Sequence, residues 1–371
     1  MTDVIVIGGG IHGSSTAFHL AQRGIKALLL EKDHVARHAS GVNAGGVRTL
    51  ARDFAEVPLS VASMEIWHGI AALLDDDCGF DSHGQVIAAE TEAQMASLRQ
   101  RVARLNAMGF THEEAIDERE LRAIIPSIAE HCLGGVVARR DGAAIPFRAT
   151  TAFARAAQRR GARIVEGARV DRVARRGRLW RVETAVGVFE APALVNCAGA
   201  WADRIAAQLG EPVPLEVIAP MLMITSRLPP FIKPVLIAAG RTLSFKQFAN
   251  GTVLIGGGHR GRATRDENRT DLDWGRLATN AETVWDLVPI MRSAQIVRAW
   301  AGIEARMPDD IPVIGPSSTH EACWHGFGFS AHGFQLGPIV GSILAELVAT
   351  GRTNLPIAPF AIGRFTSARK S

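Results

Sequence analysis

The sequence has 371 residues, of which 47% are hydrophobic and 21% charged, with a formal net charge of +4. This composition excludes long disordered segments, and the length exceeds that of most single-core domains, so we expect two domains. Basic residues are spread along the chain without a basic block, which disfavours nucleic-acid binding.

Four cysteines, Cys78, Cys132, Cys197 and Cys323, lie far apart and form no CxxC pair. We therefore expect buried thiols and neither a metal site nor a disulfide framework. The chain enters its first strand without a basic leader, and its longest apolar stretch, 336–348, is too short and too rich in glycine to cross a bilayer. These features predict a soluble, cytoplasmic protein without a transmembrane segment.

A dinucleotide-binding pattern occupies residues 3–32. A strand, 4–7, precedes the turn GGGIHG, a helix to about Arg23 and a second strand, 25–30. Three glycines permit a tight turn, close approach to a pyrophosphate and packing of the helix on the strand, and the acid after the second strand can bind ribose hydroxyls but repels the 2′-phosphate of NADP. The pattern predicts NAD or FAD, held by Gly8, Gly10, Ile11, His12, Gly13, Glu31 and Lys32.

Small residues dominate the next stretch, 39–47, which is either a cofactor-lining segment or a flexible loop. Its position directly after a dinucleotide motif favours the first interpretation. Here the chain resembles the D-amino-acid-oxidase-like flavoproteins, the family of glycine oxidase, sarcosine oxidase and the small-amine dehydrogenases. The resemblance implies FAD, with its pyrophosphate and isoalloxazine contacted by Ser40, Asn43, Gly45 and Gly46.

Two arginines, Arg48 and Arg52, lie four apart and would share a face if a helix starts here. An arginine fork grips a carboxylate with two parallel hydrogen bonds. The monomeric sarcosine oxidases carry paired arginines near this point to hold the substrate carboxylate, although at a spacing of three. Solvated surface arginines are the alternative.

Long helical segments between Glu56 and Arg140 indicate the start of a second domain, with helices expected over 90–108 and 117–125. Its histidines have no metal-ligand spacing. A helix over 148–160 follows, and then short strands within 163–190. Val170 resembles the family valine whose backbone brackets the adenine.

The string CAGAWA begins at Cys197, after a buried strand, 193–196. Small residues between a strand and a helix bring the backbone close to phosphates and ribose. The string closely resembles its family counterpart, which assigns Cys197, Ala198, Gly199 and Trp201 to the cofactor.

Paired strands over 242–247 and 251–257 are expected across a turn at Asn250-Gly251, followed by a helix over 277–287. In the family, a sheet of this kind covers the flavin and forms the substrate pocket. The pocket candidates are Lys246, Gln247 and His259.

The segment from Trp300 to Pro316 resembles the family pattern W-x-G…P-D…P-x-I-G, which assigns Gly302 to the cofactor. Glycine oxidases have a carboxylate-binding arginine where Glu304 aligns. An acid there could meet a cationic group on the substrate or the reacting amine.

The last motif, FGFSAHGFQLGP, leads into a closing helix predicted over 339–349. A helix N-terminus can stabilise negative charge on a reduced flavin. The motif assigns His332, Gly333, Phe334 and Gln335 to the site, and its sequence most resembles that of the catalytic subunits of opine and hydroxyproline dehydrogenases.

The predicted fold is α/β: a Rossmann-like, glutathione-reductase-like FAD-binding domain with an inserted α+β substrate domain that contains a mixed or antiparallel sheet. The FAD-binding domain is assigned to 1–80, 143–215 and 296–371, and the substrate domain to 81–142 and 216–295.

The resemblance implies an enzyme that oxidises the C–N bond of an amino acid, such as an N-substituted glycine, an opine or hydroxyproline, by hydride transfer to flavin N5. FAD is expected to be noncovalent, because neither family attachment point exists at Gly302 or Pro146. A 2-hydroxyacid dehydrogenase with His332 or His259 as base, or an electron-passing subunit, are the alternatives.

Sarcosine oxidases use a flavin-adjacent lysine to activate oxygen, and the corresponding stretch here, 253–256, has none. A further lysine of those oxidases is Gln335 in this chain. These departures favour a dehydrogenase with partner subunits over a free oxidase.

Overall fold

The computed structural model describes residues 2–365. A six-stranded sheet forms the base of the fold, in the order β21-β22-β12-β1-β2-β8, and β21 is its one antiparallel strand. Its central strands are apolar and buried on both faces, as expected of a parallel sheet. The bounds are β1 Val4–Ile7, β2 Ala27–Leu30, β8 Arg163–Val165, β12 Ala193–Asn196, β21 Val313–Pro316 and β22 Cys323–Phe327.

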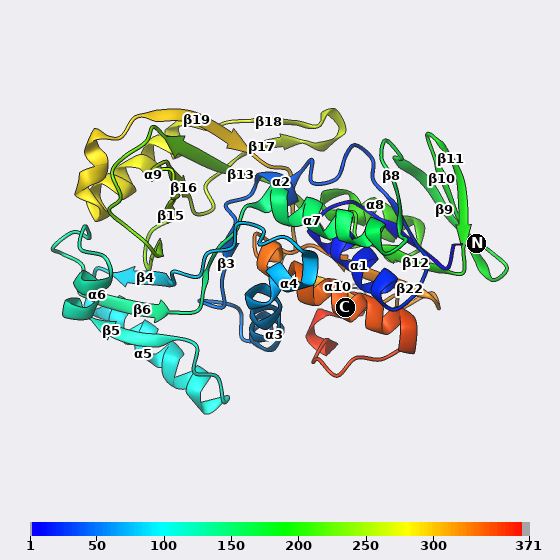
Figure 1. The fold of residues 1–371 in the computed structure, drawn as a ribbon, viewed down its shortest axis with the longest axis horizontal. Coiled ribbons are helices and arrows are strands. Elements are labelled where there is room, and N and C mark those ends of the chain that lie inside the picture. Colours follow the sequence, from blue (N-terminus) through cyan, green and yellow to red (C-terminus); the bar gives the residue numbers. More distant parts are fainter. Residues whose placement is uncertain (1, 366–371) are drawn as a thin grey trace.

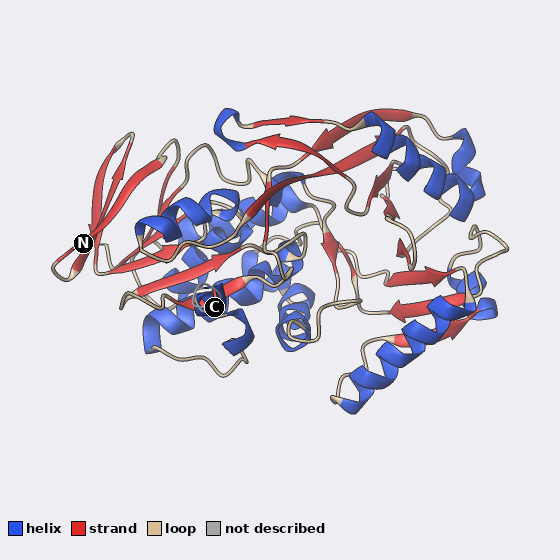
Figure 2. Ribbon diagram, turned by 180° about the vertical axis from the view of Figure 1, so that it is seen from behind, coloured by secondary structure: helices blue, strands red, loops and turns tan. Residues whose placement is uncertain are grey.

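Side chains that alternate along β1 separate two cores. Val4 and Val6 pack with the helices of one face, whereas Ile5 and Ile7 pack with a three-stranded sheet on the other. Figures 1 and 2 show these layers at the end of the molecule where the N-terminus lies. The helices of the first face are α1 Ile11–Gln22, α3 Val57–His68, α4 Ile70–Leu74, α7 Pro146–Arg159 and α10 Gly333–Thr350. The small sheet contains β9 Val170–Arg176, β10 Leu179–Thr184 and β11 Gly187–Ala191, and α8 Ala202–Gln208 packs on its side.

A second, eleven-stranded sheet forms the other half of the molecule (Figure 1), organised around the ten-residue strand β13, Glu216–Thr225, which pairs with four other strands. The other strands are β4 Gln85–Ala89, β5 Glu114–Asp117, β6 Gly134–Ala138, β14 Val235–Ala238, β15 Ser244–Gln247, β16 Val253–Gly256, β17 Arg260–Thr264, β18 Arg269–Asp271, β19 Ile296–Ala301 and β20 Glu304–Arg306. Its helices are α5 Glu92–Ala107, α6 Glu118–Ile124 and α9 Trp274–Leu287.

Short elements join the two halves. The pair β3 Gly46–Val47 and β7 Gly142–Ala143 connects the small-residue segment to the chain leaving β6. The remaining elements are α2 Ala39–Val42, η1 Gly199–Trp201, η2 Arg265–Glu267, η3 Pro289–Ser293, η4 Ala358–Phe360 and η5 Ile362–Phe365.

The predicted fold class is confirmed by this mixed α/β architecture. The division into two domains stays a proposal, and the sheets group β19 and β20 with the eleven-stranded sheet although both follow residue 295.

One condition considered above is not met, and one local prediction is wrong. No helix starts at Arg48, because Ala51 has φ of 55° and the helix begins only at Val57. The closing helix begins at Gly333 rather than 339, although Pro338 lies inside it. Side chains added at Gly337 or Gly341 would collide with Ile11 or Ser15, so close packing on α1 holds the early turns in place.

The helix α10 is long and apolar enough to cross a membrane by length and composition, contrary to the expectation for 336–348. Its apolar window is 72% buried inside the fold, where it packs on α1 and α3. It is therefore the core helix of this domain.

Candidate functional site

A cavity of about 1010 Å³ lies between the two sheets, at the carboxyl ends of β1, β2 and β12. Open α/β sheets bind ligands at this edge. The glycine turn forms one wall, and strands of the large sheet form the opposite wall. Segments that line it include 7–12, 30–33, 36–40, 42–46, 168–171, 197–201, 220–222, 302–305 and 331–334, together with Arg48 and Arg52.

Two glycines of the turn have no room for a side chain. Gly8 has φ of +106°, and a Cβ there would lie 2.4 Å from the carbonyl oxygen of Cys197. A Cβ on Gly13 would lie 1.9 Å from the carbonyl oxygen of Gly8. Gly13 does not line the cavity. It allows α1 to approach the turn, so that the helix N-terminus faces the cavity as an anion site.

Glu31 fixes the turn from the end of β2. Its carboxylate accepts hydrogen bonds from the backbone N–H groups of Gly9, at 2.6 Å, and Asp33, at 2.8 Å. Burial raises its pKa above the ordinary value, despite these two donors. Next to it, the Lys32 ammonium lies 4.1 Å from the ring centroid of Trp201 and donates to Asn268 at 2.7 Å. The second contact holds the segment between η2 and β18 at this end of the cavity.

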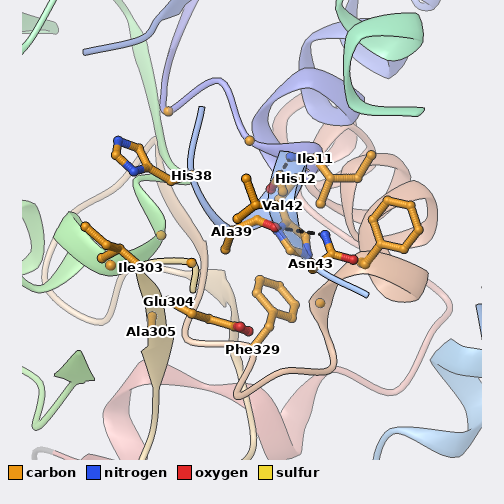
Figure 3. A pocket seen from close by; sticks show the side chains of 18 of the residues that line it. Ile11, His12, His38, Ala39, Val42, Asn43, Ile303, Glu304, Ala305 and Phe329 are labelled. Atoms are coloured by element: carbon orange, nitrogen blue, oxygen red, sulfur yellow. Dashed lines mark hydrogen bonds between the residues drawn. The ribbon is translucent and has the colours of Figure 1, made fainter. Parts of the chain in front are cut away.

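His12 stacks on Phe329 with ring centroids 3.6 Å apart (Figure 3). Burial lowers the pKa of His12 to about 3, so the ring is neutral and adds no charge to the helix N-terminus. The hydroxyl of Ser40 accepts a hydrogen bond from Ile11 N–H at 2.9 Å.

The small-residue segment is ordered as a lining of the cavity. Asn43 accepts from Gly45 N–H at 2.7 Å and donates to the carbonyl of Ala39 at 2.8 Å. Gly45 has φ of +69°, and a Cβ there would lie 2.2 Å from the carbonyl oxygen of Ala144. Gly46, Val170, Ala198, Gly199 and Gly302 line the same cavity, as do Cys197 and Trp201.

Arg48 and Arg52 both reach the cavity wall, although no helix joins them. The Arg52 Nε–H donates to the carbonyl of Arg48 at 3.1 Å, and the Arg52 side chain is only 1% exposed. Burial, reinforced by the charge of Arg48, lowers the pKa of Arg52 to about 9. Its Nη1 is buried and has no hydrogen-bond acceptor among the described residues, and it lies 3.9 Å from a carboxylate oxygen of Glu56.

Glu56, which no sequence motif indicates, completes this cluster. Its fully buried carboxylate lies 3.9 Å from Arg52 Nη1 and 3.4 Å from His332 Nδ1, and neither oxygen has a hydrogen-bond partner in the part of the chain that the structure describes. Burial opposes ionisation, but the contact with His332 and the charge of Arg52 hold the pKa of Glu56 below its ordinary value. Burial lowers the pKa of His332.

The arginine segment is held from behind by buried polar groups. Asp141 accepts hydrogen bonds from the backbone N–H groups of Thr49 and Leu50 at 2.8 to 2.9 Å, and burial raises its pKa to about 6. Gln335 does not line the cavity, contrary to its predicted cofactor contact. Its side-chain oxygen accepts from Arg52 Nη2 at 3.2 Å, so Gln335 positions the guanidinium.

Glu304 faces the cavity from β20, beside Phe329 (Figure 3). It accepts a hydrogen bond from Ala331 N–H at 2.7 Å. Burial raises the pKa of Glu304 to about 7. His332, Gly333 and Phe334 continue this wall into the N-terminus of α10.

The other pocket candidates lie outside the lining. The amide of Gln247 donates to the carbonyl of Pro229 at 3.0 Å. His259 follows the lining residues Gly257 and Gly258 but is not itself part of the lining, and Arg276 lies close enough to affect its charge. Lys246 is 6% exposed, and its Nζ has no acceptor among the described residues. A Cβ on Gly45 would lie 3.2 Å from that Nζ, so Lys246 supports the lining from one layer behind.

Comparison with protein-family models matches residues 3–347 to the DAO family, described as FAD dependent oxidoreductase. Mitochondrial sarcosine dehydrogenase of Mus musculus is 26% identical over 383 residues, which cover 98% of this chain but 41% of that relative. The hydrogen cyanide synthase subunit HcnC of Pseudomonas aeruginosa is 24% identical over 415 residues, with 98% and 96% of the two chains covered.

Among solved structures, L-proline dehydrogenase from P. horikoshii superposes with a TM-score of 0.92 at 27% identity, over 99% of this chain and 98% of that chain. The likeness therefore includes both sheets.

Proposed function

This chain belongs to the DAO family of FAD-dependent oxidoreductases, and from that premise we propose that it oxidises the C–N bond of an amino acid whose amine is secondary. It is an FAD enzyme of the amino-acid or amine oxidoreductase type. Secondary amines are favoured because the final motif resembles dehydrogenases of opines and hydroxyproline, and because names of similar proteins include sarcosine and L-proline dehydrogenases.

FAD fits the cavity on grounds of this chain's own geometry. The crowded turn at Gly8 and Gly13 leaves bare backbone at the N-terminus of α1, where a pyrophosphate would lie. We assign the adenosine end to Glu31 and Val170, and the flavin end to the segment 43–46 and the N-terminus of α10. When bound, FAD supplies the chemistry by accepting a hydride from the substrate.

The pair of arginines in the cavity wall, Arg48 and Arg52, is the observation that carries the proposal. Two neighbouring guanidinium groups match the charge and the two oxygens of an amino-acid carboxylate. Glu56 holds Arg52 on one side and His332 on the other, so the cluster is preorganised. The protein's tasks are then to hold the carboxylate, orient the α-carbon and exclude water.

The positive end of α10 has a second role. Its first residues, Gly333 and Phe334, line the cavity, so their N–H groups and the helix dipole favour negative charge there. Electrons that leave the substrate create such charge, and a preorganised dipole stabilises it without reorganisation.

We further propose that electrons leave through a partner subunit or a soluble acceptor. The support is the name of one relative, a subunit of hydrogen cyanide synthase, which matches this chain over nearly the whole length of both. The final motif also resembles catalytic subunits that pass electrons onward.

The test is anaerobic reduction of the protein-bound FAD by a panel of N-methyl amino acids, primary amino acids and 2-hydroxyacids. We expect bleaching of the flavin absorbance by N-methyl amino acids, at least about tenfold faster than by the other classes, a difference of ~1.4 kcal/mol in barrier. Faster bleaching by 2-hydroxyacids would contradict the proposal and favour the CH–OH dehydrogenase. No bleaching by any class would favour a subunit that only passes electrons.

A further inference from the structure

Glu304 stands across a tight turn from the arginine cluster. The turn, 329–332, joins β22 to α10, and two consecutive residues in it contact the two groups. Ala331 N–H donates to Glu304, whereas His332 contacts Glu56, which lies beside Arg52. A negative group and a pair of positive groups therefore border one cavity on either side of this turn.

The turn is held rigidly in that position. Ser330 donates its N–H to the carbonyl of Ala305 at 3.1 Å, and its hydroxyl accepts from Met307 N–H at 3.0 Å. Ser330 and Ala331 have φ of 51° and 69°, two successive left-handed residues other than glycine. This conformation is costly, and strained backbone of this kind concentrates at ligand sites. It aims the Ala331 N–H at Glu304, which fixes the carboxylate toward the cavity.

The second oxygen of Glu304 makes no hydrogen bond among the described residues, and no basic side chain of the described part forms an ion pair with it. The nearest positive influence is Arg260, which acts at longer range. Glu304 is partly buried and lines the cavity, so its second oxygen is open to a ligand there. A cation bound in the cavity could form a charge-assisted hydrogen bond with this carboxylate.

We propose that Glu304 binds a permanently cationic group of the substrate, so that the preferred substrates are N-substituted amino acids with a guanidinium or ammonium group beyond the reacting amine. This inference rests on the proposed function, and it names the substrate class. Arg48 and Arg52 take the carboxylate at one end of such a molecule, and Glu304 takes the cation at the other.

The reacting amine is a poorer match for Glu304. Hydride loss from the α-carbon requires the amine lone pair, so the amine must be neutral when it reacts. A carboxylate beside it would favour its protonated form and slow the reaction. A guanidinium or side-chain ammonium keeps its positive charge throughout the reaction, so a carboxylate beside it does not slow hydride transfer.

The test uses two matched substrates, Nα-methylarginine and Nα-methylcitrulline, which have nearly the same shape but end in a guanidinium and a neutral urea. With the FAD-loaded protein, we expect kcat/KM for the cationic member to exceed that of the neutral member by at least about tenfold. Glu304→Gln should reduce this ratio to about one by slowing the cationic member, and Glu304→Asp should retain part of it. Glu216→Gln, at the exposed first residue of β13, removes the same charge and should leave the ratio unchanged.

Equal loss with both substrates in Glu304→Gln would overturn the proposal and assign Glu304 to the reacting amine. A binding measurement keeps this result separate from failure of the proposed function. The α-methyl analogues of arginine and citrulline lack the α-hydrogen and cannot be oxidised by hydride transfer, but we expect their binding to perturb the visible spectrum of bound FAD. Preferential binding of α-methylarginine that disappears in Glu304→Gln supports the inference even if no amine reduces the flavin, and equal binding of the two analogues refutes it.

Discussion

Lys246 on β15 and Leu254 on β16 lie directly opposite each other in an antiparallel pair, so their side chains point to the same face of the sheet. Leu254 belongs to the stretch in which sarcosine oxidases carry their oxygen-activating lysine. The neighbouring strand therefore provides an amine on the same face, and it lies against Gly45 of the cavity lining. Burial lowers the pKa of Lys246 to about 7.

We still predict that the reduced protein gives its electrons to an artificial dye at least about tenfold faster than to oxygen, a barrier difference of ~1.4 kcal/mol. Lys246 is one layer behind the lining, so its effect on oxygen is indirect. The measurement is stopped-flow reoxidation of substrate-reduced protein by air-saturated buffer and, separately, by dye. Equal rates in the isolated chain would contradict the prediction.

The residual oxygen reaction should depend on Lys246 and on pH. The amine is protonated below a pKa of about 7 and neutral above it, so its positive charge is lost as the pH rises through that value. We expect the oxygen rate to fall over the same range in the natural protein and to be low and flat in Lys246→Met. Lys233→Met, which changes an exposed lysine, should behave like the natural protein.

Removal of the Arg52 guanidinium should lower kcat/KM, because the desolvated substrate carboxylate loses its partner. The expected loss corresponds to about 2 to 5 kcal/mol of transition-state stabilisation. The FAD content should stay normal. Since Arg52→Ala also leaves Glu56 as an unpaired buried charge, the double variant Arg52→Ala, Glu56→Gln separates folding from binding. It should recover stability without recovering kcat/KM. Arg140→Ala, at an exposed ion pair, is the control.

Gly13→Val should yield a protein that does not hold FAD. The new side chain would meet the carbonyl oxygen of Gly8, which is only 1.9 Å from the position of its Cβ, and would push α1 away from the turn. The ratio of flavin to protein absorbance measures occupancy. Gly69→Ala provides a matched control, because its Cβ would find its nearest neighbour at 3.7 Å and occupancy should be unaffected. Full occupancy in Gly13→Val would mean that the pyrophosphate lies elsewhere.

Acid precipitation should release all the flavin, since Gly302 and Pro146 occupy the positions of the family attachment residues. The supernatant should then be yellow, and the mass of the chain should equal that of the polypeptide alone, 39.7 kDa. A chain heavier by the mass of a flavin would refute noncovalent binding.

The cofactor half of the site could be predicted because its signals are local. The turn between β1 and α1 needs glycine at Gly8 and Gly13 for reasons of backbone geometry that apply wherever such a turn occurs. Glu31 then follows from the length of the βαβ unit. In the structure Gly8 and Glu31 line the cavity and Gly13 lies behind it against Gly8, so cofactor contact by these residues stays a prediction.

The substrate half depends on contacts between distant segments, which leave weaker marks in the sequence. Glu56 looks like an ordinary acid ahead of a helix, and only the packing of α3 on α10 buries it against Arg52 and His332. The two arginines come together through backbone hydrogen bonds to Asp141 rather than through a helix. The sequence does not show that Lys246 lies opposite Leu254, because this depends on the register in which β15 and β16 pair.

The order of strands in the base sheet has a consequence for the synthesis of this protein. The strand β1 pairs with β12 from Val4 to Ala193, and β12 in turn pairs with β22 from Leu194 to Cys323. Pairings between segments so far apart in the sequence slow folding, and β1 is synthesised well before its partner β12. The glycine turn is therefore made early but completed late. We expect that N-terminal fragments ending before β12 cannot retain flavin, and that cofactor loading follows release of the full chain.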